Sequence, residues 1–488
     1  MILFLQTLNI LNVILGVLFQ LLLLRLFGAS VETDVFFLAN AIVQFLSALL
    51  TGFLLDVYIP MYHAVKVESE AEAHRFAGAM FGLALGVSFV LLLLVLFAAP
   101  LLITLFASGF SEEKASAAQQ ALRVLSLSIP FTVSTLVLHS TLNAHLMLAV
   151  TYWVNLITPA FGIGAVVLLG AAHGLYPILT ALVAASAVAF LVVLIYYRAQ
   201  FGWHWANPFA LPVVKSLLRL NLPVRAGTLI YSLRGPLTMN VLSFFPTGTL
   251  TLYQYADKIL ATLFSIANAP VLQILYTKAS SLLPQAKYAE VSSALKATVR
   301  SNVALTVAAL IPTVLLFQPV FGMLLKHRVS PEELSTMFLF FLALAPFYLT
   351  LSFETPFVNI TLALKQGKRV LRIGTIFVVL YSLFLFGGKQ MLGLYAVPVA
   401  LFLAQLQNAV SYSRFVARQI PIFDHELQSI LTRFLLVTVT VLALHLGLRN
   451  DGDLIVYANL LILGMWVVLG GKETLASFRF ITTRGEIR

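Results

Sequence analysis

The chain is a succession of apolar stretches, each about as long as a membrane-spanning helix. Of its 488 residues, 60% are hydrophobic and only 10% are charged, and the mean hydropathy is +0.97. A soluble domain carries about 25% charged residues, so water alone would not solvate the surface of this chain. These values exclude the soluble globular and the disordered classes, and we expect lipid to surround most of the protein.

Fourteen stretches are apolar enough to cross a bilayer, which takes about 20 mostly apolar residues. Two of them, 33–60 and 76–106, exceed one span, so we expect tilted or bent helices there. The sequence therefore predicts an all-α polytopic membrane protein with helices near residues 2–24, 33–60, 76–106, 124–147, 150–172, 176–197, 217–243, 249–276, 302–325, 335–362, 370–388, 392–413, 431–448 and 454–470.

The basic residues indicate the orientation of these helices. With the N-terminus inside, 20 of the 30 Lys and Arg residues fall in cytoplasmic segments and six in outer loops. Cytoplasmic loops carry an excess of Lys and Arg, so we expect both termini in the cytoplasm. The net charge of +11 then reflects topology and not nucleic-acid binding, which needs a basic soluble face. The first stretch lacks the basic start of a signal peptide and is interpreted as a retained helix.

A polar interruption separates the first six predicted helices from the other eight. The expected parts are an N-terminal lobe at 1–200, a linker at 201–216, a C-terminal lobe at 217–418 and a tail with two further helices at 419–488. Residues 36–42 and 253–259 align weakly, which places the second helix of each half in equivalent positions. Parallel repeats of this kind are a transporter architecture.

The segment 277–301 differs from the spans because it alternates charge with an apolar stripe. Tyr288, Val291, Leu295 and Val299 recur at helical spacing among four basic residues. We expect an amphipathic helix on the cytoplasmic leaflet or between the two halves. An ordinary solvated loop is the alternative.

Several kinds of chemistry are excluded by what the sequence lacks. Cysteine is absent, which excludes disulfides, Cys-ligated zinc and iron–sulfur clusters. The histidines show no metal-binding spacing, and there is no Walker A motif. We expect a transporter without a cofactor, not an enzyme, driven by the membrane potential or an ion gradient.

Two motifs carry a resemblance to a known family. Residues 25–39 read RLFGASVETDVFFLA, and residues 253–258 read YQYADK. The first resembles the R-x-F-G-A-x-x-x-T-D-A-F-F-x-A signature of the lipid II flippase (MurJ/MviN) family, and the second resembles that family's Y-Y-A-D-R motif. The number of helices and the basic loop at 365–369 are also similar.

The resemblance implies a V-shaped transporter of two six-helix lobes plus two C-terminal helices, in a bacterial inner membrane. It implies translocation of an undecaprenyl-pyrophosphate-linked glycan to the outer leaflet by alternating access, with the lipid tail against 431–448 and 454–470. The expected partners are this substrate, membrane lipids and envelope-glycan synthesis proteins, and we expect a monomer. Lipid II and an exopolysaccharide or O-antigen type precursor both remain candidate substrates.

The chain departs from the family pattern in its first two helices. Family members carry arginines there that face the central cavity, in S-R-V-L-G-x-x-R-D and R-R patterns. The corresponding residues here are uncharged, from Asn12 to Gly16, at Phe19 and Gln20, and from Leu46 to Ala48. The N-terminal lobe thus lacks most of the charge that the family uses to hold a pyrophosphate.

Cations inside predicted spans, together with Asp257 beside one of them, are the candidate substrate-binding residues, because an intramembrane charge is costly and usually faces a partner or a polar cavity. Lys258 takes the place of the arginine in the family motif beside Asp257, and a lysine neutralises a phosphate as a point charge. An ion pair with Asp257 or snorkelling to the interface is the alternative for Lys258. Arg234 is a further candidate, with pairing to Glu354 or Asp257 as its alternative, and so is Arg225, with snorkelling as its alternative.

Four other charges are expected to act in gating or in the structure. Arg25 and Asp34 flank the first outer loop, where pairing or helix capping is the simplest role. Asp56 lies towards the cytoplasmic end of its helix, and Glu354 lies inside a long apolar run. Glu354 either pairs with Arg234 or Lys258, or binds a coupling ion.

Other classes of function stay open at this point. An ion-coupled multidrug or small-molecule exporter would use the same scaffold but a compact acidic cavity, against which the cations argue. A membrane glycosyltransferase would need a catalytic acid and usually a large outer loop. A transport-inactive scaffold homologue is consistent with the missing arginines.

Overall fold

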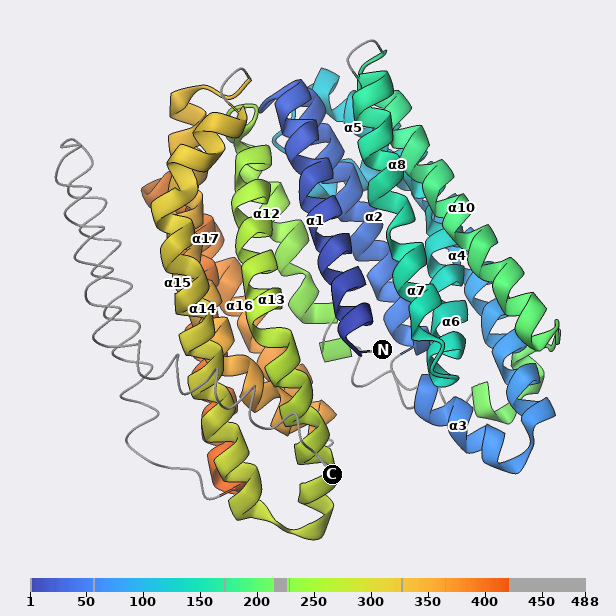
Figure 1. Ribbon diagram of the computed structural model, residues 1–488. Helices are drawn as coiled ribbons and strands as arrows, with labels where there is room; N and C mark the ends of the chain where they lie inside the picture. The colour runs from blue at the N-terminus through green and yellow to red at the C-terminus, as the bar shows by residue number, and fades with distance from the viewer. Residues whose placement is uncertain are drawn as a thin grey trace. The chain divides into compact units, whose positions relative to one another are not determined.

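The computed structural model describes residues 2–55, 58–170, 173–214, 226–227, 229–325, 328–364 and 366–420, and all regular secondary structure in them is helical (Figure 1). Ten segments of this part are long and apolar enough to cross a membrane. Because the last of them contains two helices, the ten segments hold eleven of the predicted helices. Of the other three, 217–243 is described only in part, and 431–448 and 454–470 lie outside the described residues. The predicted all-α membrane fold is confirmed.

The first half of the chain forms the helices α1 (Ile2–Phe27), α2 (Val31–Leu55), α3 (Tyr58–Glu68), α4 (Glu70–Phe106), α5 (Glu112–Ser126), α6 (Ile129–Ala144), α7 (Leu148–Asn155), α8 (Ile157–Ala165), η1 (Val166–Gly170) and α10 (Tyr176–Phe201). The second half forms η2 (Pro208–Ala210), α12 (Arg234–Leu242), α13 (Thr249–Leu282), η3 (Leu283–Gln285), α14 (Tyr288–Leu325), α15 (Pro331–Ala363), α16 (Gly367–Leu392), η4 (Gly393–Tyr395) and α17 (Ala396–Gln419).

The helix starts follow from local capping chemistry. Ser69 accepts a hydrogen bond from the backbone N–H of Glu72 and caps α4. Ser330 and Glu333 form a reciprocal capping box at the start of α15, with Pro331 as its first residue. Such caps satisfy donors that the first turn of a helix leaves open, and acidic side chains there favour the helix dipole.

Several helices are longer than the membrane is thick. α14 has 38 residues, which corresponds to about 57 Å, whereas the hydrocarbon core is about 30 Å thick. The segment 277–301 accordingly forms the ends of α13 and α14, joined at η3, and not one separate helix. Its apolar residues Val291, Leu295 and Val299 are buried in the protein core. Tyr288, the first residue of the expected stripe, is exposed. The amphipathic role expected for this segment stays a prediction.

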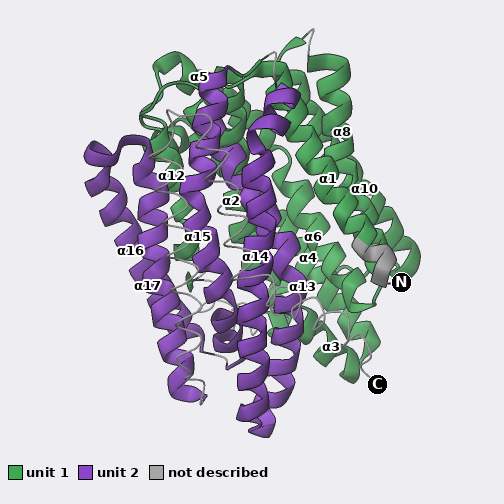
Figure 2. Cartoon of the chain, turned by 60° about the vertical axis from the view of Figure 1, so that its left-hand side comes forward, with its two compact units in different colours: residues 1–251, 327–329 green, residues 252–326, 330–488 purple. Residues whose placement is uncertain are grey.

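The chain divides into two compact units, coloured in Figure 2. Unit 1 comprises residues 1–251 and 327–329, and unit 2 comprises residues 252–326 and 330–488. This boundary falls later than the linker expected at 201–216, because α12 packs against α2 and α4. The division into two six-helix lobes stays a prediction.

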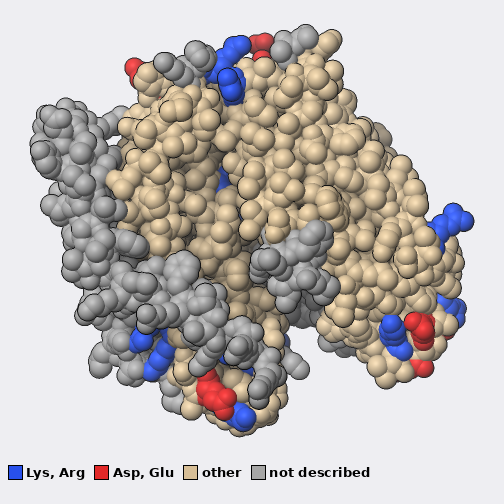
Figure 3. Space-filling view, in the orientation of Figure 1, with Lys and Arg blue, Asp and Glu red and all other residues tan. Residues whose placement is uncertain are grey.

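Each unit has its own core. In unit 1, α4, α6 and α10 pack together, and the largest fully buried side chains include Tyr58, Tyr62 and Phe76. In unit 2, α13 to α17 share an apolar cluster that includes Leu275, Phe353 and Tyr412. On the face shown in Figure 3, most of the Lys, Arg, Asp and Glu side chains gather towards the top and bottom of the view, and the surface between them is largely uncharged. That distribution is typical of a protein whose middle is surrounded by lipid.

Candidate functional site

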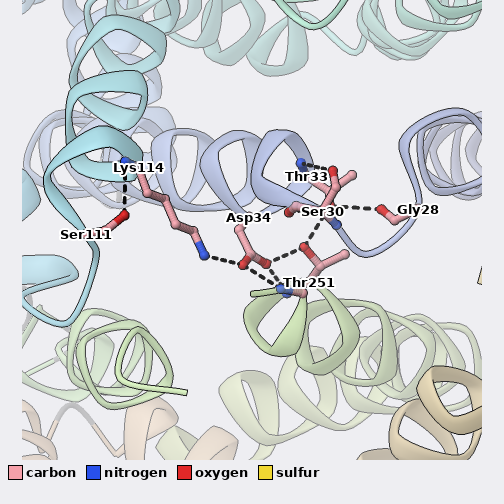
Figure 4. Close-up of polar contacts among 8 residues, drawn as sticks. Gly28, Ser30, Thr33, Asp34, Ser111, Lys114 and Thr251 are labelled. Carbon is pink, nitrogen blue, oxygen red and sulfur yellow. Dashed lines mark hydrogen bonds and ion pairs between the residues drawn. The ribbon is translucent and has the colours of Figure 1, made fainter. Parts of the chain in front are cut away.

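A buried carboxylate in unit 1 organises the best-defined polar site of the described structure. Asp34 lies in the first turn of α2 and is 1% exposed. Beside it, the Thr33 hydroxyl accepts a hydrogen bond from the Ser30 backbone N–H (3.0 Å) and donates one to the Gly28 carbonyl (2.9 Å). These short-range bonds fix the start of α2 and direct Asp34 away from the α1–α2 turn (Figure 4).

The Asp34 carboxylate has four donors. The Lys114 ammonium lies 2.6 Å from Oδ2, and the Gly248 backbone N–H donates to the same oxygen over 2.8 Å. The Thr251 backbone N–H (2.9 Å) and its hydroxyl (2.6 Å) both donate to Oδ1 (Figure 4). The carboxylate is therefore fully hydrogen-bonded, which is what a buried charge requires.

Asp34 caps α13 from a distant part of the chain. Gly248 immediately precedes this helix, and Thr251 is its third residue. These two positions carry the donors that a capping box satisfies within one helix. A negative charge at this end also favours the helix dipole. The arrangement thus fixes the start of α13 within unit 1, while the rest of the helix belongs to unit 2.

Two glycines allow the backbone to approach this site closely. Gly248 has a φ of +90°, and a Cβ there would lie 2.6 Å from the Ala29 carbonyl oxygen. Gly28 has a φ of +68°, and a Cβ would lie 2.7 Å from the Arg328 carbonyl oxygen. Only glycine adopts such conformations without strain and fits such spaces.

The sequence interpretation anticipated the structural role of Asp34 but not its partner. Arg25 is exposed in the last turn of α1, and the ion pair of Asp34 is with Lys114. In the sequence, Lys114 follows Glu112 and Glu113 at a helix start. This pattern is typical of a solvent-exposed first turn, so it did not indicate a buried ion pair. One general rule could have identified the partner: a buried carboxylate needs a nearby cation. Lys114 is a lysine near the same end of the helix bundle as Asp34.

A second polar cluster lies at the end of α3 and was not predicted. The Tyr62 hydroxyl is 2.9 Å from Nε2 of His145, and Nζ of Lys66 is 3.5 Å from its Nδ1. Burial raises the pKa of Tyr62 to about 12, and burial together with Lys66 lowers the pKa of His145. Both groups are therefore neutral near pH 7. They contact each other across 83 positions of sequence, so no local pattern indicated the pair.

The predicted substrate residues Lys258 and Asp257 lie in α13, in unit 2. Lys258 is exposed and forms no ion pair with any described residue. The Asp257 carboxylate instead accepts a hydrogen bond from the Tyr348 hydroxyl (2.8 Å). The local Lys258–Asp257 pair considered from the sequence is therefore not formed.

Arg234 lies in unit 1, so the structure does not bring it together with Lys258 in one unit. It is half-buried at the first residue of α12, donates to the Tyr231 hydroxyl (2.9 Å) and lies over the Tyr231 ring. Nearby, the Asn240 amide donates to the Leu105 carbonyl and to Ser108, both over 2.9 Å. These contacts attach α12 to the end of α4.

Glu354 is buried inside α15 and accepts a hydrogen bond from the Gln405 amide of α17, which is also buried. Asp56 and Arg225 lie outside the described residues. Within the part of the chain that is described, no group of three or more His, Cys, Asp or Glu side chains has the arrangement of a metal site.

Comparison with known proteins identifies the fold and the family. A solved structure of the lipid II flippase MurJ in an inward closed conformation aligns over 100% of both chains, with a TM-score of 0.74 and 18% identity. An inward-facing multidrug resistance MATE transporter of the MOP superfamily aligns over 86% of this chain and 96% of its own, with a TM-score of 0.69 and 14% identity. A MOP superfamily transporter from Pyrococcus furiosus aligns over 83% and 96%, with a TM-score of 0.59 and 14% identity.

No curated protein matches the chain in sequence. The family model described as lipid II flippase MurJ, however, matches residues 23–462, which is most of the chain. This match and the ten apolar segments indicate a multi-pass protein of the bacterial inner membrane. The chain belongs to the lipid II flippase MurJ family.

Proposed function

We propose that the protein moves an undecaprenyl-(pyro)phosphate-linked oligosaccharide, lipid II or a related envelope precursor, from the inner to the outer leaflet by alternating access. The observation that carries the proposal is the family match over residues 23–462. The all-helical fold, with ten segments able to span a membrane, supports it. The proposed outward direction is the one that the family resemblance implies.

Lys258 is the proposed contact for the substrate phosphate. It is exposed on α13, and the neighbouring carboxylate of Asp257 is engaged by Tyr348 and not by the lysine. A lysine without a carboxylate partner keeps its full charge for an anion and binds phosphate without a fixed geometry. Arg234, Arg225 and Asp257 are proposed as further substrate contacts.

Asp34 and Glu354 are proposed as structural charges. Asp34 has four donors within unit 1, and Glu354 is bonded to Gln405 within unit 2. Arg25 and Asp56 are proposed to act at the ends of their helices, in gating or in the structure.

The charge-poor N-terminal half bears on which glycan lipid is carried. The only charged residue of α1 is Arg25, in its last turn. With so few cations there, the phosphate is held mainly by the C-terminal half, and precursors other than lipid II fit as well. The same observation favours a transport-inactive homologue as the second candidate function.

Complementation separates these candidates. A strain depleted of its lipid II flippase should grow when it expresses the wild-type protein, and Lys258→Ala should reduce growth at equal protein level. Lys258→Arg, which keeps the charge, is the matched control and should retain activity. Failure of an expressed, correctly localised wild type would exclude lipid II as the substrate. Rescue by Lys258→Ala equal to the wild type would exclude the proposed phosphate contact.

A further inference from the structure

Unit 1 contains a partly open cavity, lined by six polar and three apolar residues, that the proposed phosphate contacts do not use. It has a volume of about 130 Å³ and lies among α6, α7, α8 and α10. Its polar lining consists of Thr132, Thr135, His139, Asn155, Thr158 and Ser186. Each of these residues lies within a segment that is apolar enough to span the membrane. Six hydrogen-bonding side chains around one cavity at that position are unusual, since polar groups in such segments are costly.

Two of these side chains are buried without a partner. His139 is 6% exposed and Thr135 is 8% exposed. Nε2 of His139 and Oγ1 of Thr135 have no hydrogen-bond partner in the described structure. Leaving such groups unsatisfied costs about 1–3 kcal/mol each, and native proteins satisfy nearly all of them. Because both side chains line the same cavity, we infer that a group inside it supplies the missing bonds.

The helix beside the cavity is irregular at one residue, Leu156, which lies between α7 and α8 and keeps a right-handed helical backbone. Pro159 has no N–H and therefore does not donate to the Asn155 carbonyl four residues earlier. Ser186, in contrast, donates to the Leu182 carbonyl of its own helix (3.0 Å).

The lining restricts the chemistry of the occupant. It contains hydroxyl, amide and imidazole groups but no carboxylate, lysine or arginine. A metal cation would lack a counter-charge there, and an anion would lack a cation. Neutral imidazole and hydroxyl groups each donate or accept, which matches a ligand with alternating hydroxyl and amide groups. The cavity has room for several waters or for one small polar ring.

We propose that this cavity binds the uncharged sugar part of the translocated lipid through Thr135, His139 and Asn155, while the phosphate is bound elsewhere. This inference rests on the proposed function. It assigns recognition of the glycan to residues of unit 1. It also gives the charge-poor N-terminal half a role in the choice of substrate.

The test compares two lipids with the same undecaprenyl pyrophosphate part, of which only lipid II carries the sugar with its attached peptide. The full-length protein in nanodiscs is titrated with lipid II and with undecaprenyl pyrophosphate, and the dissociation constants are compared. The wild type should bind lipid II more tightly. Thr135→Val and His139→Phe should reduce that preference about fivefold or more, the effect of one or more lost hydrogen bonds, and should leave binding of undecaprenyl pyrophosphate unchanged.

Two controls keep the measurement interpretable. Thr180→Val removes an exposed hydroxyl that already donates to the Pro177 carbonyl of its own helix, so it should change neither constant. His139→Gln keeps a hydrogen-bonding group and should retain most of the preference.

The outcomes separate the two levels of the proposal. If Thr135→Val and His139→Phe fold and both keep the wild-type preference, the cavity holds only water and the inference is overturned. If the wild type binds both lipids equally, the inference fails while phosphate binding stands. If the wild type binds neither lipid, the proposed function fails, and the inference that rests on it fails too.

Discussion

Two polar sites in unit 1 bury hydrogen-bonding groups in opposite ways. At Asp34, four donors converge on one carboxylate, and every donor comes from the chain itself. In the cavity, His139 and Thr135 present groups that no described residue satisfies. An unsatisfied buried group lowers stability. The Asp34 site therefore stabilises the folded chain without a ligand, whereas the cavity site is completed only when a ligand binds. The comparison predicts opposite responses to mutation.

The largest expected effect comes from removing the cation of the satisfied site. Lys114→Met leaves the buried Asp34 carboxylate without its counter-charge, which should destabilise the protein by about 3–5 kcal/mol. Thermal unfolding of the purified protein in detergent measures the loss. Arg123→Met, in the same helix but exposed, is the matched control and should have little effect.

The pair can also be tested as a unit. Asp34→Asn removes the charge that Lys114 compensates, so adding it to Lys114→Met should recover part of the loss. If Lys114→Met unfolds at the wild-type temperature, the ion pair is not a stabilising part of unit 1, and the contrast between the two sites disappears.

A smaller effect should follow from crowding the backbone at the same site. Gly248→Ala adds a Cβ 2.6 Å from the Ala29 carbonyl oxygen, at a residue with a φ of +90°. The clash and the strained conformation together should cost about 1–3 kcal/mol, measured by the same unfolding experiment.

Gly393→Ala is the control, because Gly393 also has a positive φ but no atom within 4 Å of its Cβ position. It should show the conformational cost alone. Equal losses in the two variants would mean that the close approach of Gly248 to Ala29 adds nothing to the stability of the site.

The sequence was informative about what repeats along the chain and uninformative about what converges in space. The apolar runs predicted the all-helical membrane fold, and eleven of the predicted helices fall in the ten apolar segments of the described residues, because successive residues of a span must satisfy the same solvent. The length of α14 was missed, because the charged stretch at 288–301 was separated from the apolar stretch at 302–325, although one helix spans both. Burial of Val291 and Leu295 by other helices was not visible in their own periodicity.

The sequence likewise did not show which residues meet at the two polar sites. Asp34 was recognised as a structural charge from its position at a helix start. Its partners, however, lie 80 positions away at Lys114 and 217 positions away at Thr251. His139 drew no attention in the sequence, because a single histidine in an apolar helix has no local pattern. Only packing shows that its ring meets Thr135 and Asn155 at one cavity.

The smallest expected effect is also the one that separates the two sites most clearly. Thr251→Val and Thr135→Val are the same change, an isosteric loss of a buried hydroxyl. The Thr251 hydroxyl donates to Asp34 over 2.6 Å, so its loss should cost about 1–2 kcal/mol. The Thr135 hydroxyl has no partner in the described structure. Its replacement by a methyl group should leave the stability of the ligand-free protein unchanged or slightly higher, because an unmet desolvation cost is removed.

Unfolding of both variants without added lipid measures the difference. A loss for Thr135→Val as large as that for Thr251→Val would show that the cavity hydroxyl serves the fold, and the distinction between a site completed by the chain and a site completed by a ligand would not hold.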